Sequence, residues 1–148
     1  MGSLYVELQE HHAALQPDNP RYHVEPTRWL EIARTAIEHP DDEVVVAEEE
    51  RTVIGFATLR YEEKPWGLAC QVETLIVARR WRGQGVGSAL LRAAEESAAA
   101  RGARGMRVEV LEENADGRRF YEDRGYGTLA LRYGKPIMGA GPPLPTAD

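Results

Sequence analysis

The sequence predicts an α/β domain in which helices pack against a mixed β-sheet. One observation is a pair of β-rich runs, 43–47 and 52–61, on either side of a charged segment, which is typical of an antiparallel hairpin. The other is a strand, a glycine-rich turn, an amphipathic helix and a second strand in succession between residues 71 and 111. Since such crossovers are right-handed and join parallel strands, the sheet should contain both kinds of pairing.

Two helices are expected ahead of the hairpin. Residues 4–15 carry apolar side chains at helical spacing, and the turn-forming residues 17–20 end that pattern. The second helix begins at Pro26, because proline suits the first position of a helix, and it ends at His39 and Pro40.

The hairpin is expected to turn at residues 48–51. Gly55, inside its second strand, marks either a bulge or a close contact with another element. Residues 62–67 should form a loop, and residues 71–78 should form the next strand.

The helix after the glycines is expected to end at residues 101–102, since glycine is common just past the C-terminus of a helix. Alternating apolar residues predict a strand over 106–111, and a short helix follows over 114–124. Residues 126–137 are expected to form a last strand.

Length and composition favour one ordinary globular domain. The 148 residues suit a single domain, which we assign to residues 1–138, followed by a disordered tail over 139–148. A net charge of −6 gives no general support for a nucleic-acid partner. No apolar run is long enough to span a membrane, and the N-terminus lacks the layout of a signal peptide. We therefore expect a cytoplasmic domain with neither a nucleic-acid nor a membrane partner.

Metal and disulfide chemistry find no support in the sequence. A lone Cys70 excludes an internal disulfide and a cysteine-rich zinc site. The histidines have no carboxylate partner at a recognisable metal-binding spacing. We expect no metal.

The most informative stretch is 72–92, VETLIVARRWRGQGVGSALLR. A strand, a glycine-rich turn and a helix N-terminus bring several backbone N–H groups to one place, which is typical of a phosphate site. The dinucleotide pattern G-x-G-x-x-G fails because its third glycine is missing after Gly85, and a P-loop fails because no lysine follows the last glycine. What fits is R-x-x-G-x-G at residues 82–87, preceded by E-x-L-x-V at 73–77.

These motifs resemble the acetyl-CoA signature of the GNAT acyltransferases. The resemblance covers residues 43–137 and, more loosely, the helices before them. It implies a single GNAT-like domain whose mixed, mostly antiparallel sheet has a central parallel βαβ pair and flanking helices, with a CoA-binding core over 71–125. The family usually has a strand before its first helix, whereas only residues 1–3 precede Leu4 here. By resemblance, the CoA pyrophosphate is held by Arg82, Gly83, Gln84, Gly85, Val86, Gly87 and Ser88.

The resemblance also assigns residues to the thioester and to the leaving group. Residues 114–126, NADGRRFYEDRGY, are similar to the family segment N-x-x-A-x-x-F-Y-E-x-x-G-F. Asn114 would therefore contact the pantetheine arm, and Tyr121 would protonate the leaving thiolate; the alternative is that Tyr121 is a core aromatic. Gly117 replaces the alanine of the family, which predicts a less rigid helix. Polarisation of the thioester carbonyl falls to the backbone N–H groups of Leu75, Ile76 and Val77.

Glu73 is the best candidate for a general base. In strand alternation it shares a face with Leu75 and Val77, and partial burial would raise its pKa towards neutrality. The alternative is a carboxylate that is solvated or paired to an arginine. Glu109 is the second candidate. Cys70 lies on the opposite face with nothing to lower its pKa, which disfavours an acyl-cysteine and favours direct attack in a ternary complex.

The predicted function is that of an acetyl-CoA-dependent N-acetyltransferase that acts on a primary amine. The acidic balance would favour a cationic acceptor, while the alternative, which the sequence favours, is that these are ordinary solvated charges. We expect a small-molecule or peptide amine, with a small molecule favoured over a protein. The alternative is a non-catalytic acyl-CoA-binding or sensing domain. GNAT domains often dimerise, so a homodimer is compatible with the resemblance, although no stretch marks an interface. The acceptor site would be lined by Tyr5, His12, Tyr22, His23, Trp29 and Trp66.

Overall fold

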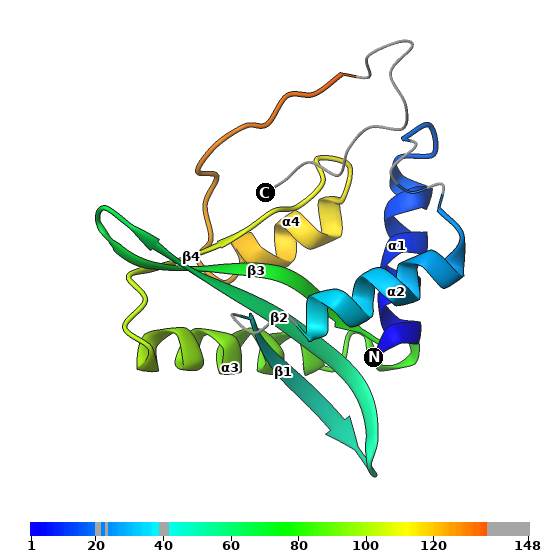
Figure 1. The fold of residues 1–148 in the computed structure, drawn as a ribbon, viewed down its shortest axis with the longest axis horizontal. Helices are drawn as coiled ribbons and strands as arrows, with labels where there is room; N and C mark the ends of the chain where they lie inside the picture. The colour runs from blue at the N-terminus through cyan, green and yellow to red at the C-terminus, as the bar shows by residue number, and fades with distance from the viewer. Residues whose placement is uncertain (20–21, 23, 39–41, 136–148) are drawn as a thin grey trace.

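The computed structural model describes residues 1–19, 22, 24–38 and 42–135. These residues contain a four-stranded sheet in the order β1-β2-β3-β4, with helices on both of its faces (Figure 1). The elements in chain order are α1 (Gly2–Leu15), α2 (Pro26–Ile37), β1 (Asp42–Glu49), β2 (Thr52–Lys64), β3 (Gly67–Val77), a 3₁₀ turn (Arg79–Trp81), α3 (Val86–Ala100), β4 (Gly105–Val108) and α4 (Ala115–Glu122).

The sheet is mixed, as the sequence predicts. β1 pairs with β2 and β2 with β3 in antiparallel fashion, whereas β3 and β4 are parallel. The parallel pair is joined through α3, which confirms the predicted βαβ crossover.

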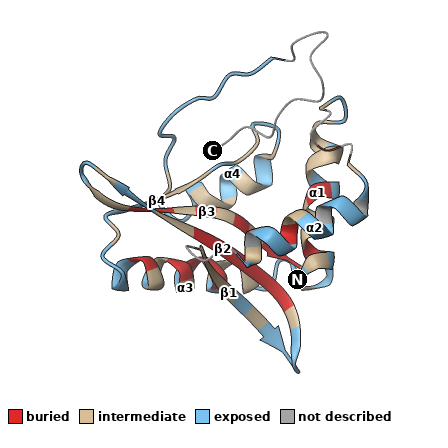
Figure 2. Ribbon diagram, in the orientation of Figure 1, coloured by how far each residue is buried: buried red, intermediate tan, exposed pale blue. Residues whose placement is uncertain are grey.

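Each face of the sheet has its own apolar cluster. Ala94 and Ala98 of α3 pack with Leu59 and Val72 on one face. On the other face, Leu4 of α1 packs with Phe56 of β2 and Ile76 of β3. Figure 2 shows this burial as red segments along β2, β3 and α3.

Gly55 allows α3 to approach the sheet closely. A Cβ atom at this position would lie 2.8 Å from the carbonyl oxygen of Ile76 and 3.1 Å from Cδ1 of Leu90. The close contact is therefore confirmed, since a side chain here would meet both β3 and α3. A bulge also lies beside this glycine, because Ala47 pairs with Gly55 and Glu48 with Val53, which leaves Ile54 without a partner on β1.

The expectation of a loop over residues 62–67 is wrong. β2 runs on to Lys64, β3 begins at Gly67, and these two residues are cross-strand partners around a two-residue turn. The charged residues 62–64 suggested a loop, but they lie on an outer part of a long hairpin where polar side chains reach solvent. Gly67 supports the tight turn with a φ of 121°, a conformation that L side chains rarely adopt.

The expectation of a last strand over residues 126–137 is also wrong. The described part of this segment, residues 126–135, forms no strand. The alternating apolar side chains of this segment are exposed: Leu129 at 77%, Leu131 at 74% and Tyr133 at 88%. β4 ends at Val108 rather than at residue 111, so it offers only a short edge for pairing. Residues 136–137 and the tail at 139–148 lie outside the described part of the chain.

Candidate active site

The two parallel strands, β3 and β4, part after a short stretch of pairing at one edge of the described sheet. Their pairing ends at Val72 and Val108, where β4 stops, while β3 continues to Val77. β2 still pairs with β3 along this continuation, so only the β4 side of residues 73–77 lacks a strand.

Backbone N–H groups of β3 point into this opening. The N–H of Ala78 donates to the carbonyl of Ile54 at 2.8 Å, so it points towards β2. Since N–H groups alternate in direction along an antiparallel strand, those of Val77 and Leu75 point to the side without a strand. By the same alternation, the N–H of Ile76 points towards β2. Of the three expected donors, Leu75 and Val77 are thus the ones directed to the opening.

The glycine loop presents free donors at the start of α3. Gly83 and Gly85 have φ values of 71° and 86°, and a Cβ atom at either would meet no other atom within 4 Å. Among the residues that the structure describes, none accepts a hydrogen bond from the backbone N–H groups of residues 83–88. Free donors, a helix N-terminus and open space suit an anion of the phosphate type.

The side chain of Arg82 folds back onto the end of β3 and towards α1, although it remains 41% exposed. Its Nε donates to the carbonyl oxygen of Val77 at 2.9 Å, and its Nη2 lies 3.0 Å from Oε1 of Glu7 on α1. Gln84 likewise donates from Nε2 to the carbonyl of Arg80 at 2.9 Å. These two side chains therefore shape the loop, while the backbone provides its donors.

Arg124 is a residue near this loop that sequence reasoning missed. It donates from Nη2 to the hydroxyl of Ser88 and from Nη1 to the carbonyl of Phe120 at 2.6 Å, and its guanidinium lies 3.9 Å from the centre of the Phe120 ring. It lines a shallow pocket of about 300 Å³ with Ser88, Leu91, Arg92 and Glu95. Nothing in the sequence singles out Arg124, because an arginine just after a helix is explained equally well by its favourable interaction with the helix dipole.

Tyr121 lies on α4, next to Phe120, whose ring lies beside Gly87 at the start of α3. Its ring packs edge-on against Phe120 and Tyr126, with centroids 5.0 and 5.4 Å apart. Burial raises the pKa of Tyr121 from 10.0 to about 12. Within the described chain no group is hydrogen-bonded to its hydroxyl. The phenol is thus neutral at pH 7 and keeps its proton available to a ligand.

Asn114 caps α4. Its Oδ1 accepts from the N–H of Gly117 at 2.9 Å, and a Cβ atom at position 117 would lie 2.5 Å from the Asn114 amide nitrogen. Gly117 therefore leaves room for the capping side chain, which gives the departure from alanine a physical reason. The same cap holds Asn114 in one orientation at the start of the helix that carries Tyr121.

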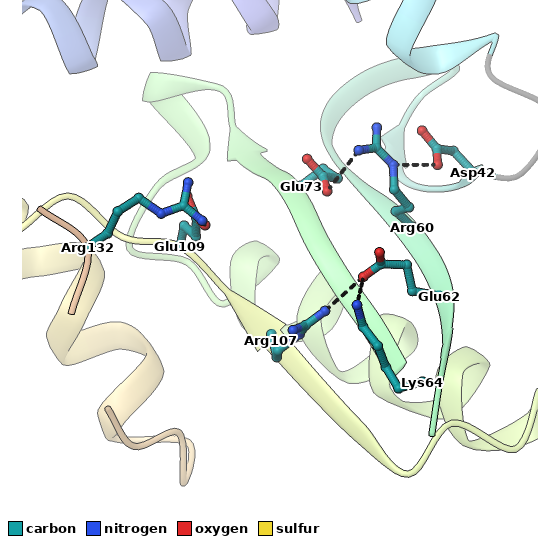
Figure 3. Close-up of polar contacts among 8 residues, drawn as sticks. All are labelled: Asp42, Arg60, Glu62, Lys64, Glu73, Arg107, Glu109 and Arg132. Carbon is teal, nitrogen blue, oxygen red and sulfur yellow. Dashed lines mark hydrogen bonds and ion pairs between the residues drawn. The ribbon is translucent and has the colours of Figure 1, made fainter. Parts of the chain in front are cut away.

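A β-bulge determines where Glu73 points. Thr58 pairs with Thr74 and Leu59 with Val72, so Glu73 has no partner on β2. Leu59 faces α3, and Arg60, the next residue, faces the other side of the sheet. Glu73 lies on that other side, where Figure 3 shows it beside Arg60.

The expectation that Glu73 shares a face with Leu75 and Val77 is therefore wrong. The extra residue of the bulge reverses the alternation, so that Leu75, whose partner is Ala57, packs towards α3. Glu73 instead pairs with Arg60, with Oε1 and Nη1 3.5 Å apart, which confirms the alternative of an arginine partner. A neighbouring guanidinium favours the charged form of a carboxylate.

The Arg60 side chain links two carboxylates across three strands. Its Nε lies 3.4 Å from Oδ1 of Asp42 on β1, whose side chain is 1% exposed (Figure 3). With Glu73, the row places two acidic side chains and one arginine on the face of the sheet beside the opening.

The other two candidates for chemistry lie in less suitable places. Glu109 is paired with Arg132 and half exposed. Cys70 is fully buried in the cluster under α3, and burial raises the pKa of its thiol, which makes it a poor nucleophile.

The proposed acceptor-lining residues are only partly brought together. His12 and Tyr22 stack with their rings 5.5 Å apart, and Tyr5 packs beside the α1 cluster. Trp66 lies in the β2–β3 turn, at the far end of β3 from Val77. His23 and the side chain of Trp29 lie outside the described part of the structure.

A family model described as the acetyltransferase (GNAT) family matches residues 7–126. The chain belongs to this family. It is therefore a GNAT N-acetyltransferase, and membership implies acetyl-CoA as the acetyl donor.

Solved structures support the same fold. The chain is 28% identical to a putative acetyl transferase from Pyrococcus furiosus, with a TM-score of 0.74 over 92% of this chain and 91% of that one. It is 18% identical to a glucosamine-6-phosphate N-acetyltransferase from Arabidopsis thaliana, with a TM-score of 0.60 over 77% and 80% of the two chains. An aminoglycoside acetyltransferase from an uncultured soil metagenomic sample has 18% identity and a TM-score of 0.63 over 72% and 73%. A comparison with curated proteins gave no match.

Metal-binding clusters and membrane-spanning helices are both absent from the described residues of this GNAT protein. Among these residues, no group of three or more histidine, cysteine or acidic side chains is arranged to hold a metal. Nor does any helix found there have the length and apolarity needed to cross a membrane.

Proposed function

We propose that this GNAT protein transfers the acetyl group of acetyl-CoA to a primary amine by direct attack in a ternary complex. The observation that carries the proposal is the meeting of three elements at Gly87. A Cβ atom there would lie 3.7 Å from Cγ2 of Val77 on β3 and 3.4 Å from Cε2 of Phe120 on α4. The end of β3, the start of α3 and the helix of Tyr121 thus converge beside the opening between the strands.

The residues at this point match the needs of acyl transfer. The free N–H groups of residues 83–88 and the open space around Gly83 and Gly85 fit the pyrophosphate of CoA. The N–H groups of Leu75 and Val77, directed to the opening, would polarise the thioester carbonyl. Ile76 packs on the opposite face of the sheet with Leu4 and Phe56, and Val86 is the first residue of α3 after the glycine loop.

Proton transfer is assigned to two side chains. Acetyl-CoA supplies the thioester, and the amine nitrogen bonds to its carbonyl carbon as the carbon–sulfur bond breaks. Tyr121, held neutral by burial, donates its proton to the departing thiolate. Glu73, whose carboxylate pairs with Arg60, accepts a proton through water from the ammonium group of the acceptor, and the neutral amine that results makes the attack. Asn114 keeps the role of contacting the pantetheine arm with its amide nitrogen.

The acceptor is proposed to be a small cationic amine. The whole chain carries a net charge of −6, which attracts a positively charged ligand. The two amino-sugar and aminoglycoside enzymes above share only the fold with this chain and do not select an acceptor.

Thermal unfolding with acetyl-CoA, CoA, NAD and ATP in parallel tests the donor. A ligand that binds only the folded state raises the unfolding midpoint, so we expect a rise with the two CoA species alone. A rise with NAD or ATP instead would reject the CoA assignment of the loop.

Initial rates test the ternary complex. Thiol release measured while acetyl-CoA and a polyamine are both varied should give intersecting double-reciprocal lines, and Cys70→Ala should retain the activity. Parallel lines, or an inactive but folded Cys70→Ala variant, would point to an acyl-enzyme and contradict direct attack.

A further inference from the structure

Glu7 on α1 reaches the chain segment that leads into the glycine loop. Its Oε1 accepts from the backbone N–H of Arg79 at 3.1 Å and from Nη2 of Arg82 at 3.0 Å, and it lies 3.8 Å from Nε of Arg79. The Glu7 side chain is only 20% exposed. One carboxylate oxygen therefore joins both ends of the 3₁₀ turn between β3 and the loop.

Arg82 extends this connection to the catalytic strand. Its Nε donates to the carbonyl oxygen of Val77, the last residue of β3. Glu7 holds the other end of the same guanidinium, so α1, the loop and the edge of the opening are joined through one side chain. α1 itself is anchored to the sheet by Leu4.

The charge of Glu7 excludes a direct role in holding phosphate. A carboxylate close to an anion site repels the ligand, so its presence there needs another reason. Orientation of Arg82 supplies that reason, because an arginine on a flexible chain would otherwise lose conformational freedom when the loop receives its ligand.

We propose that Glu7 is a positioning residue for the CoA site: it fixes Arg82 and the start of the glycine loop in the conformation that receives the CoA pyrophosphate. The proposal rests on the proposed role of this loop in binding CoA. Glu7 acts through Arg82 and the Arg79 N–H, and it touches neither the donor nor the acceptor.

Three variants separate this role from a simple contribution of α1 to stability. Glu7→Ala removes the contacts of this side chain with Arg79 and with Arg82. Glu7→Gln keeps a neutral oxygen for the Arg79 N–H, and Glu10→Gln changes an exposed glutamate of the same helix. We expect the Kd for CoA to rise about threefold in Glu7→Gln and about tenfold in Glu7→Ala, from the loss of an ion pair and then of a hydrogen bond. Glu10→Gln should match the wild type.

The kinetic readout is the KM for acetyl-CoA, which should rise while the KM for the amine and kcat at saturation stay near the wild-type values. A variant that is merely less stable would not raise the KM for acetyl-CoA while leaving the KM for the amine and kcat unchanged. If Glu7→Gln and Glu7→Ala bind CoA as tightly as the wild type, or more tightly, the proposal is overturned.

A double-mutant cycle with Arg82→Ala tests the route of the effect. If Glu7 acts through Arg82, adding Glu7→Ala to Arg82→Ala should weaken CoA binding by less than Glu7→Ala does alone. Full additivity would overturn the proposed route. Failure of the wild type to bind CoA would instead reject the proposed function of the loop, which keeps the two failures distinct.

Discussion

Tyr121 keeps its proton throughout the pH range in which an acetyltransferase is assayed. Burial raises its pKa to about 12, and no neighbouring charge contributes to that shift. Tyr121 is therefore protonated at pH 7 and can act as a proton donor. Ionising the buried phenol costs free energy, which the protonation of the departing thiolate must offset.

Replacement of Tyr121 by phenylalanine should lower kcat by about a hundredfold, the usual contribution of a general acid, and leave the Kd for CoA unchanged. Thiol release between pH 6 and 10 measures this, and in the wild type no loss of rate over that range should arise from Tyr121. Tyr126→Phe is the matched control, because Tyr126 stacks on Tyr121 but donates to Glu95. Wild-type kcat in Tyr121→Phe would remove the proposed acid.

Glu73 and Arg60 form one ion pair, so a pair of variants can separate catalysis from packing. Glu73→Gln should reduce kcat by about a hundredfold if the carboxylate is the base. Arg60→Gln breaks this ion pair and also the pair with Asp42, but it keeps the carboxylate of Glu73 and should retain most of the activity. Equal kcat values in the two variants would show that Glu73 serves only the ion pair.

At the scale of elements, α3 has a left-handed glycine just beyond each end. Gly85 precedes the helix with a φ of 86°, and Gly102 follows it with a φ of 83°. A Cβ atom at either position would meet no other atom within 4 Å, so backbone strain rather than a clash decides the effect of a side chain.

Alanine at either glycine should lower the free energy of unfolding by a similar amount, about 1–2 kcal/mol, because both must adopt the left-handed conformation. Only Gly85→Ala should also weaken CoA binding, since Gly102 lies at the opposite end of the helix. Denaturant unfolding and CoA titration of both variants measure the two effects. Equal CoA affinity in the two variants would argue against the loop as the phosphate site.

The strands show how far local patterns can mislead at this scale. The alternation of Leu129, Leu131 and Tyr133 is that of a strand, yet these side chains are exposed and the segment forms none. A strand needs a partner edge as well as a pattern, and the edge available here, β4, is four residues long.

At the scale of the whole molecule, a polar cluster fastens the edge strand β1 to α3. Glu43 accepts from the hydroxyls of Tyr61 and Ser97 and pairs with Arg101, whose guanidinium lies 4.4 Å from the centre of the Tyr61 ring. Burial raises the pKa of Tyr61 to about 12, and burial and Glu95 raise the pKa of Tyr126 as well. With Tyr121, three tyrosines of the fold thus resist ionisation.

Alkaline pH should therefore destabilise the protein. Below pH 10 these tyrosines are protonated in both states and stability is complete; between pH 10 and 12 the unfolded chain ionises first, so the free energy of unfolding falls. The chain has only two lysines, Lys64 and Lys135, and the buried thiol of Cys70, whose pKa burial also raises, adds to the same fall. Urea unfolding at pH 8, 10 and 11 should show the fall, and it should be shallower in Tyr121→Phe. A flat profile would contradict the burial of these phenols.

Much of the site could be predicted because its signals are local. The glycine spacing at 82–87, the period of each helix and the segment around Tyr121 depend on neighbouring residues, and short-range geometry translates them directly into turns and helices. These features sufficed for the family, the parallel crossover and the proposed acid.

Only the tertiary structure decided where Glu73 points, where β3 and β4 part, and which residue holds Arg82. A bulge adds one residue to one strand, and the partner strand, not the local pattern, determines where it lies. The contact of Glu7 with Arg82 spans 75 residues of sequence and has no periodicity to reveal it. The sequence by itself determined the family of the protein and the position of the glycine loop that we propose binds CoA. Long-range pairing determined which side chains face that loop, because register and packing exist only once distant strands and helices have met.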